Sequence, residues 1–126
     1  QINDIFIRMQ MLRNSQLDAI WTSEPQTTQA KILGNKEIYN STKEDFTPGA
    51  IVFVNAPKIA KRKAFEDAYN KAVDMINRHP LQYFAPLIKK YMRVDDKVIS
   101  ALPKMLYKQV TQPRQRDIVK AQNAIM

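Results

Sequence analysis

The predicted fold depends on one stretch of the chain, residues 15–25, which reads Ser15-Gln16-Leu17-Asp18-Ala19-Ile20-Trp21-Thr22-Ser23-Glu24-Pro25. A helical pattern ends at its start, the apolar segment 17–21 predicts a short strand, and Pro25 suits the first turn of a new helix. This order would deliver four side chains to the carboxyl end of a strand, where ligands usually bind in open α/β sheets. The four are Trp21, Thr22, Ser23 and Glu24.

Sequence patterns typical of helices lie on both sides of this stretch. Apolar residues recur three or four positions apart at Ile2, Ile5, Met9 and Leu12. They predict a first helix that Asn3 or Asp4 caps. A second helix is expected over 26–33, with Ser23 as its cap and Gly34 as its end, because glycine most easily adopts the left-handed conformation. Residues 36–41 then predict a short edge or crossing strand.

The second half of the chain predicts one strong strand and then helices. Residues 50–54 are a continuous apolar run of strand-forming residues. A long amphipathic helix should follow over 58–78 and stop before Pro80, because the residue before a proline avoids the helical region. Further helices are expected at 81–91, from Asp95 or Asp96 onward, and at 114–126. Pro86 and Pro103 predict breaks. The predicted fold class is α/β, with three short strands and a helical C-terminal tail.

Composition limits the function. The chain has 126 residues, 44% of them hydrophobic, which is typical of one globular domain. No apolar run reaches the roughly 18 to 20 residues of a membrane span. The net charge of +8 lies in residues 57–126, which hold fifteen basic and six acidic side chains. Such asymmetry can mark a nucleic-acid partner, but lysines that solvate amphipathic helices explain it more simply.

Catalytic motifs are missing from the sequence. There is no cysteine, a single histidine (His79), and only two glycines, Gly34 and Gly49, which rules out a glycine-rich phosphate cradle. The adjacent carboxylates at 44–45, 66–67 and 95–96 are explained by solvation or helix capping. We therefore expect no enzyme, no catalytic residue, no metal site and no cofactor.

Residues 21–24 have two open interpretations. Tryptophan offers a flat face for a ring or a cation, the two hydroxyl residues offer hydrogen bonds, and Glu24 offers a charge for an amine or an exocyclic donor. Alternatively Trp21 is a core aromatic, and Glu24 lies in a first helical turn where the helix dipole favours it. The residues alone leave both possibilities open.

The segment 11–34 resembles the solute-binding proteins of bacterial ABC importers. The particular group handles nitrate, sulfonates, taurine and thiamine pyrimidine precursors. The matching residues are Leu12, Asp18, Ala19, Glu24, Pro25, Ala30 and Gly34. The glycine usual before Asp-Ala is replaced here by Asn14-Ser15-Gln16. The strand at 51–54, a long helix that ends at Asn77-Arg78-His79-Pro80, and a helical tail extend the resemblance over nearly the whole chain.

The resemblance implies the C-terminal part of a two-lobed type II periplasmic-binding-protein fold. Residues 1–36 would end the second lobe, 37–49 would form a crossing segment and loop, and 50–126 would return to the first lobe. The ligand-facing residues would be Trp21, Thr22, Ser23, Glu24 and Asn55. The implied partners are a small solute, a membrane permease and a missing N-terminal half, with no nucleic acid. The implied location is periplasmic, or that of a surface lipoprotein whose leader is not present in this chain.

Two alternatives stay open. A small basic α/β module could bind nucleic acid through the lysine-rich helices after residue 57, and its binding would then depend steeply on salt. An enzyme that uses the same two-lobed fold for pyrimidine synthesis is known in the wider family. That enzyme would want histidine and cysteine chemistry, and this chain offers only His79.

Overall fold

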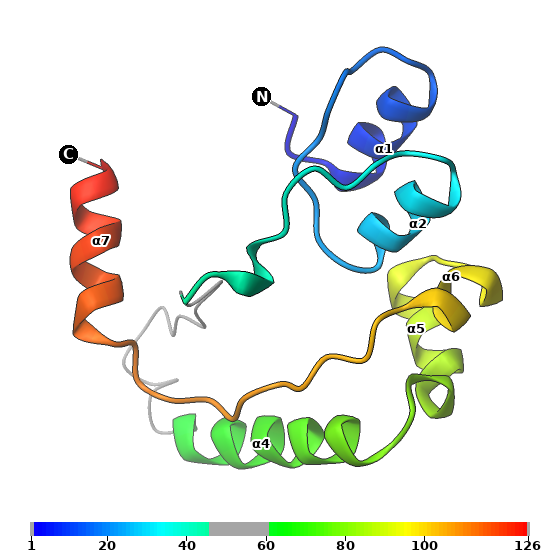
Figure 1. Ribbon diagram of the computed structural model, residues 1–126. Helices are drawn as coiled ribbons and strands as arrows, with labels where there is room; N and C mark the ends of the chain where they lie inside the picture. The colour runs from blue at the N-terminus through cyan, green and yellow to red at the C-terminus, as the bar shows by residue number, and fades with distance from the viewer. Residues whose placement is uncertain (1, 46–60, 126) are drawn as a thin grey trace. The chain divides into compact units, whose positions relative to one another are not determined.

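The computed structural model describes residues 2–45 and 61–125, and the regular secondary structure of these residues is helical (Figure 1). The helices are α1 (Ile5–Arg13), α2 (Gln26–Ile32), η1 (Ser41–Lys43), α4 (Arg62–Arg78), η2 (Leu81–Phe84), α5 (Ala85–Met92), α6 (Asp96–Ala101) and α7 (Gln115–Ile125), where η marks a 3-10 helix. No strand occurs among the described residues, so the predicted α/β class is wrong, and with it the predicted part of a type II periplasmic-binding-protein fold. None of the described helices has the length and apolarity to cross a membrane.

The segments 17–21 and 36–41, which were predicted as strands, pair with no other backbone segment among the described residues. A strand exists only where its backbone pairs with a neighbouring backbone. The carbonyl of Trp21 instead accepts a hydrogen bond from the Arg8 side chain, at 3.0 Å from Nη1. The segment predicted over 36–41 ends in η1, and the Asn40 side chain caps that turn by accepting from the Thr42 amide at 2.9 Å. The strongest predicted strand, 50–54, lies outside the described residues.

Most helix ends follow the predicted signals. The Asp4 carboxylate caps α1 by accepting from the amides of Phe6 and Ile7. Gly34 ends α2 with a φ of +91°, and the Asn35 amide donates back to the Ala30 carbonyl at 3.0 Å, which is the Schellman arrangement. The Asp95 carboxylate caps α6 by accepting from the Val98 amide. These local signals determine where the helices start and stop.

Prolines divide the second half as expected. The helix predicted over 58–78 is confirmed from Arg62 to Arg78, while 58–60 lie outside the described residues. After Pro80 the chain forms η2 and then α5, with Pro86 in the first turn of α5. The helix after Asp95 ends at Ala101, before Pro103, and the terminal helix begins after Pro113.

The chain divides into two compact units. The first comprises Gln1–Tyr39 and His79–Met105, and the second comprises Asn40–Arg78 and Leu106–Met126. The core of the first unit lies among α2, α5 and α6 and is built on Val94, Val98 and Ile99, of which Ile99 is only 2% exposed. The lobe boundaries implied by the resemblance stay a prediction.

The second unit is held together by side-chain amides of α4. The side-chain oxygen of Asn77 accepts a hydrogen bond from the Tyr107 amide at 2.9 Å, and its side-chain nitrogen donates to the Tyr107 carbonyl at 2.8 Å. Asn70, two turns earlier, accepts from the Val110 amide at 2.8 Å. The extended segment after Leu106 therefore runs along α4 (Figure 1), bound by asparagines rather than by a sheet. Among the described apolar residues of this unit, only Val73 is buried.

Candidate functional site: an exposed aromatic pair beside a half-buried arginine

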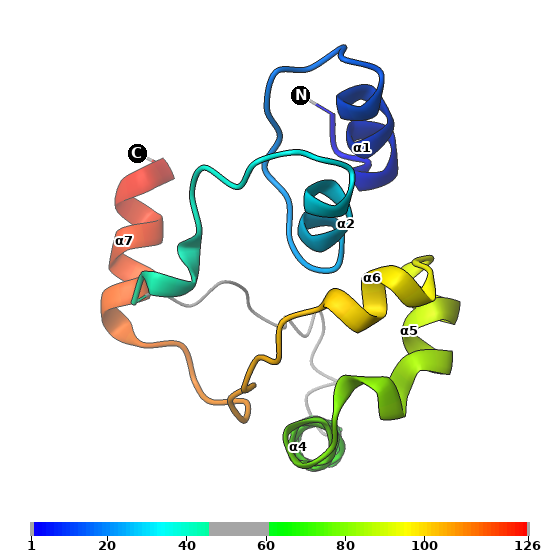
Figure 2. The same ribbon diagram turned by 45° about the vertical axis from the view of Figure 1, so that its right-hand side comes forward.

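Trp21 lies before α2 and Tyr39 lies after it, and their rings are in contact. Figure 2 shows the two chain segments that precede and follow α2. Their ring centroids are 5.7 Å apart and the rings are tilted by 32°. Trp21 is 68% exposed and Tyr39 is 54% exposed. Exposure of this extent excludes the interpretation of Trp21 as a core aromatic. These two tilted rings form an exposed apolar surface, which we call the Trp21–Tyr39 platform, and exposed apolar surface can mark a binding site.

Arg8 supports the platform from α1. Its Nη1 donates to the Trp21 carbonyl at 3.0 Å, which ties the loop before α2 to the first helix. Its Nε is enclosed and has no hydrogen-bond partner among the described residues. The same is true of the Thr22 hydroxyl oxygen, on the residue that follows this carbonyl. Two enclosed polar groups without partners therefore flank the base of Trp21.

Glu24 and Ser23 act on α2. Glu24 Oε2 accepts from the Thr28 amide at 3.1 Å, so this carboxylate caps the first turn of the helix. Ser23 is exposed, and its carbonyl, not its hydroxyl, accepts from the Thr27 amide at 3.0 Å. The predicted cap at Ser23 is therefore wrong: the N-cap residue of α2 is Pro25, two residues later, and it has no side-chain cap bond. Glu24 serves the helix dipole, as the second sequence interpretation expected.

The structure brings together part of the predicted site. Trp21 and Thr22 share it with Arg8 and Tyr39, which the sequence did not single out. Arg8 was read as part of the polar face of a helix, and no motif links it to a carbonyl thirteen residues later. Tyr39 lay in a predicted strand. Asn55, the remaining predicted ligand residue, lies outside the described residues.

Several cations of the second unit are paired with carboxylates. Arg62 contacts Glu66 at 3.2 Å and Lys63 contacts Asp67 at 3.5 Å, both one helical turn apart. These pairs occupy two of the three cations in the basic run 61–63. A phosphate backbone would have to compete with these carboxylates for the same side chains.

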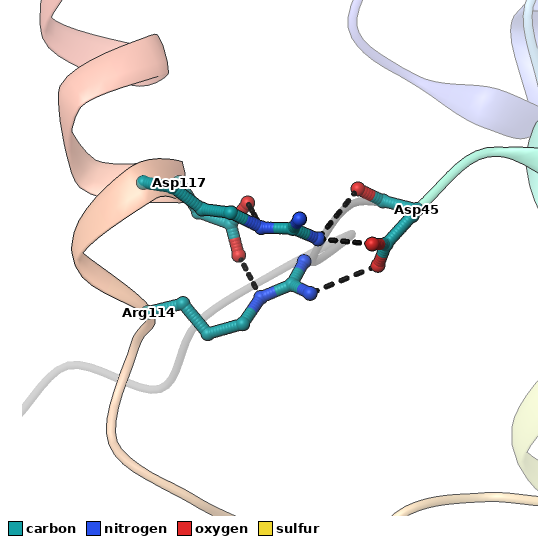
Figure 3. Close-up of polar contacts among 4 residues, drawn as sticks. Asp45, Arg114 and Asp117 are labelled. Carbon is teal, nitrogen blue, oxygen red and sulfur yellow. Dashed lines mark hydrogen bonds and ion pairs between the residues drawn. The ribbon is translucent and has the colours of Figure 1, made fainter.

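Two further arginines, Arg114 and Arg116, form ion pairs with Asp45 and Asp117 (Figure 3). Arg114 binds Asp45 at 2.8 Å and Asp117 at 2.6 Å, and Arg116 also binds Asp45. Hydrogen bonds from Arg116 and then Arg114 lower the pKa of Asp45 from 3.8 to about 2, and the bonds to Asp117 and Asp45 raise the pKa of Arg114. We name this group, Asp45, Arg114, Arg116 and Asp117, the ion-pair clasp.

The described residues hold no group of three or more side chains suited to binding a metal ion. Comparison of the chain with family models, with curated proteins and with solved structures gave no match. The described side chains at this place are the two aromatic rings, the Arg8 guanidinium and the Thr22 hydroxyl.

Proposed function

We propose that this chain is part of the substrate-binding component of an ABC importer and that it holds a small solute on the Trp21–Tyr39 platform. The observation that carries the proposal is the exposure of both rings while they contact each other. Burying an aromatic side chain is worth roughly 1.5–3 kcal/mol, and this chain leaves that free energy available to a ligand. The sequence resemblance to solute-binding proteins supports the same role.

The proposal rests on the platform and needs no sheet. The rings come from the loops around α2, and Arg8 positions one of those loops through the Trp21 carbonyl. In this proposal the solute is a sulfonate, nitrate, taurine or pyrimidine-type molecule, and a membrane permease receives it. The location would be periplasmic or on the cell surface.

Affinity should be modest for these residues alone. Stacking on one aromatic ring contributes about 1–3 kcal/mol, whereas a Kd of ~1 μM requires about 8 kcal/mol. The additional contacts would come from the N-terminal half that the resemblance implies, with water excluded around the solute. We therefore expect a dissociation constant of ~1 mM for the 126 residues by themselves.

Nucleic-acid binding is not favoured by a specific observation. The i,i+4 ion pairs and the ion-pair clasp neutralise several of the cations it would use. A gel-shift at low and physiological salt separates the two functions, because only the nucleic-acid function predicts retardation that falls steeply with salt.

The test uses Trp21 emission, since Trp21 is the only tryptophan in the chain. The chain is titrated with taurine, nitrate, a pyrimidine and benzenesulfonate up to ~10 mM, ten times the expected Kd. At least one of these solutes should change the emission saturably. Tyr39→Leu should weaken that binding, while Tyr91→Leu, at another exposed aromatic of the same unit, should not. Emission that no solute changes would refute the proposal.

A further inference from the structure

We propose that one face of α4 binds an extended polypeptide segment and that two copies of this chain exchange residues 106–125 on that face. In the single chain, the segment 106–110 of the same chain occupies the face. The inference concerns contact with a second copy and does not depend on the solute site.

The face of α4 is polar rather than apolar. Asn70, Val73, Asp74 and Asn77 follow one another at steps of one to four positions, so they share one side of the helix. All four are buried or half-buried. Three of these four side chains can form hydrogen bonds with a polypeptide that lies across them.

The two asparagines match the spacing of an extended chain. Asn77 bonds both backbone groups of Tyr107, at 2.9 and 2.8 Å, and Asn70 accepts from the Val110 amide at 2.8 Å. Seven helical residues span about 10.5 Å, and three extended residues span about 10 Å. The segment therefore runs antiparallel to α4 and stays in register with it over two helical turns.

The asparagines bind the backbone of the segment rather than its side chains. Leu106 is 79% exposed and Tyr107 is 44% exposed, and Lys108 is exposed as well. One side chain of the segment adds a bond, from Gln109 Nε2 to Asp74 Oδ1 at 3.4 Å. Because backbone groups are the same in every copy, the face of α4 cannot distinguish its own segment from that of a second copy.

The end of the chain can leave with the segment at little cost. No described residue of α7 is buried, and Ile125 is 86% exposed. The ion-pair clasp joins the start of α7 to Asp45 (Figure 3). A second copy offers the same asparagines and the same Asp45, so all of these bonds form again between copies. A foreign segment would lack Arg114 and Arg116, which makes a second copy the best-matched occupant.

The connection before the segment allows the exchange. Lys104 Nζ donates to the His79 carbonyl at 2.6 Å, and Leu102 packs against the core of the first unit. The chain is therefore attached to the first unit up to residue 104. Residues 102–105 have no regular secondary structure, so this connection can extend without breaking a helix. Exchange of an identical element between copies is a low-cost route to a dimer.

The test places cysteines where the segment meets α4, because the chain has none of its own. A chain with Asp74→Cys is mixed with a chain with Gln109→Cys and oxidised. The mixed disulfide dimer, identified by its mass, should form at ~1 mM and scarcely at ~10 μM, because the tethered segment has an effective concentration on the order of 1 mM. Lys108→Cys in place of Gln109→Cys is the matched control. It should cross-link about tenfold less, since neighbouring residues of an extended chain point to opposite sides.

A chain with both Asp74→Cys and Gln109→Cys separates exchange from an ordinary surface dimer. Its internal disulfide should form at ~10 μM and hold the segment on its own α4, so that light scattering shows a monomer even at ~1 mM. A reductant should then restore the dimer. The inference is overturned by a dimer that persists with the disulfide closed, by a reduced chain that stays monomeric at ~1 mM, or by an internal disulfide that does not form. Mixed chains that cross-link no better than the Lys108→Cys control would overturn it too.

Discussion

Three of the described helices end on a residue in the left-handed conformation, namely Ser15, Gly34 and Arg93, and only one of those residues is a glycine. Gly34 has a φ of +91° after α2, and Ser15 has a φ of +56° after α1. The backbone bonds match: the Gln16 amide donates to the Met11 carbonyl at 2.8 Å, as the Asn35 amide does to Ala30 at 3.0 Å. Ser15 is therefore strained, because its Cβ is crowded in the left-handed conformation, whereas Gly34 has no Cβ at the same position of its Schellman turn.

Opposite substitutions at these two positions should have opposite effects. Gly34→Ala should lower the free energy of unfolding by about 1 kcal/mol through backbone strain alone, since no atom lies within 4 Å of the added Cβ. Ser15→Gly should raise it by roughly 0.5 kcal/mol, the relief of strain less the greater entropy of the unfolded glycine. Urea unfolding measures both, and changes of the same sign would contradict this explanation.

At the scale of helices, the attachment of α7 is electrostatic among the described residues. None of its described residues is buried, and the ion-pair clasp joins its start to Asp45. The pKa of Asp45 is about 2 in the folded chain and 3.8 ordinarily. Its folded pKa is depressed, so its contribution is complete above pH ~4–5 and is lost as the pH falls toward 2.

Asp45→Asn should therefore loosen the start of α7 at pH 6. Hydrogen exchange of the α7 amides should be faster in the variant at pH 6, and the difference should vanish near pH 2, where the wild-type carboxylate is also protonated. High salt should reduce the difference, since these groups are exposed. Asp67→Asn removes an exposed one-turn pair on α4 and serves as the control. Equal protection of α7 in wild type and Asp45→Asn at pH 6 would contradict a role for the clasp.

At the scale of the whole molecule, the sequence predicts where helices end far better than it predicts which distant segments contact each other. Asp4, Gly34, Asp95 and the prolines act within one turn of where they stand, so their effects could be read from their neighbours. The sheet could not be read in this way, because an apolar run becomes a strand only when a distant backbone pairs with it.

The candidate site shows the same limit. Trp21 and Thr22 were identified from their residue types and from their place before a helix. Arg8 and Tyr39 were not, since the contacts that bring them to Trp21 are set by how α1 and the segment after α2 pack rather than by any spacing. Glu24 was expected in the first turn of the helix, but it lies just before α2 and binds the Thr28 amide, a contact that the sequence did not predict.

The most direct measurement of solute capture follows the single indole N–H resonance of Trp21 by NMR as benzenesulfonate is added. We predict that this resonance shifts saturably with a Kd of ~1 mM and that Tyr39→Leu weakens the binding severalfold. Tyr91→Leu should leave the titration unchanged. An indole resonance that stays in place up to ~10 mM benzenesulfonate, or one that shifts equally in Tyr39→Leu, would contradict a solute site on the Trp21–Tyr39 platform.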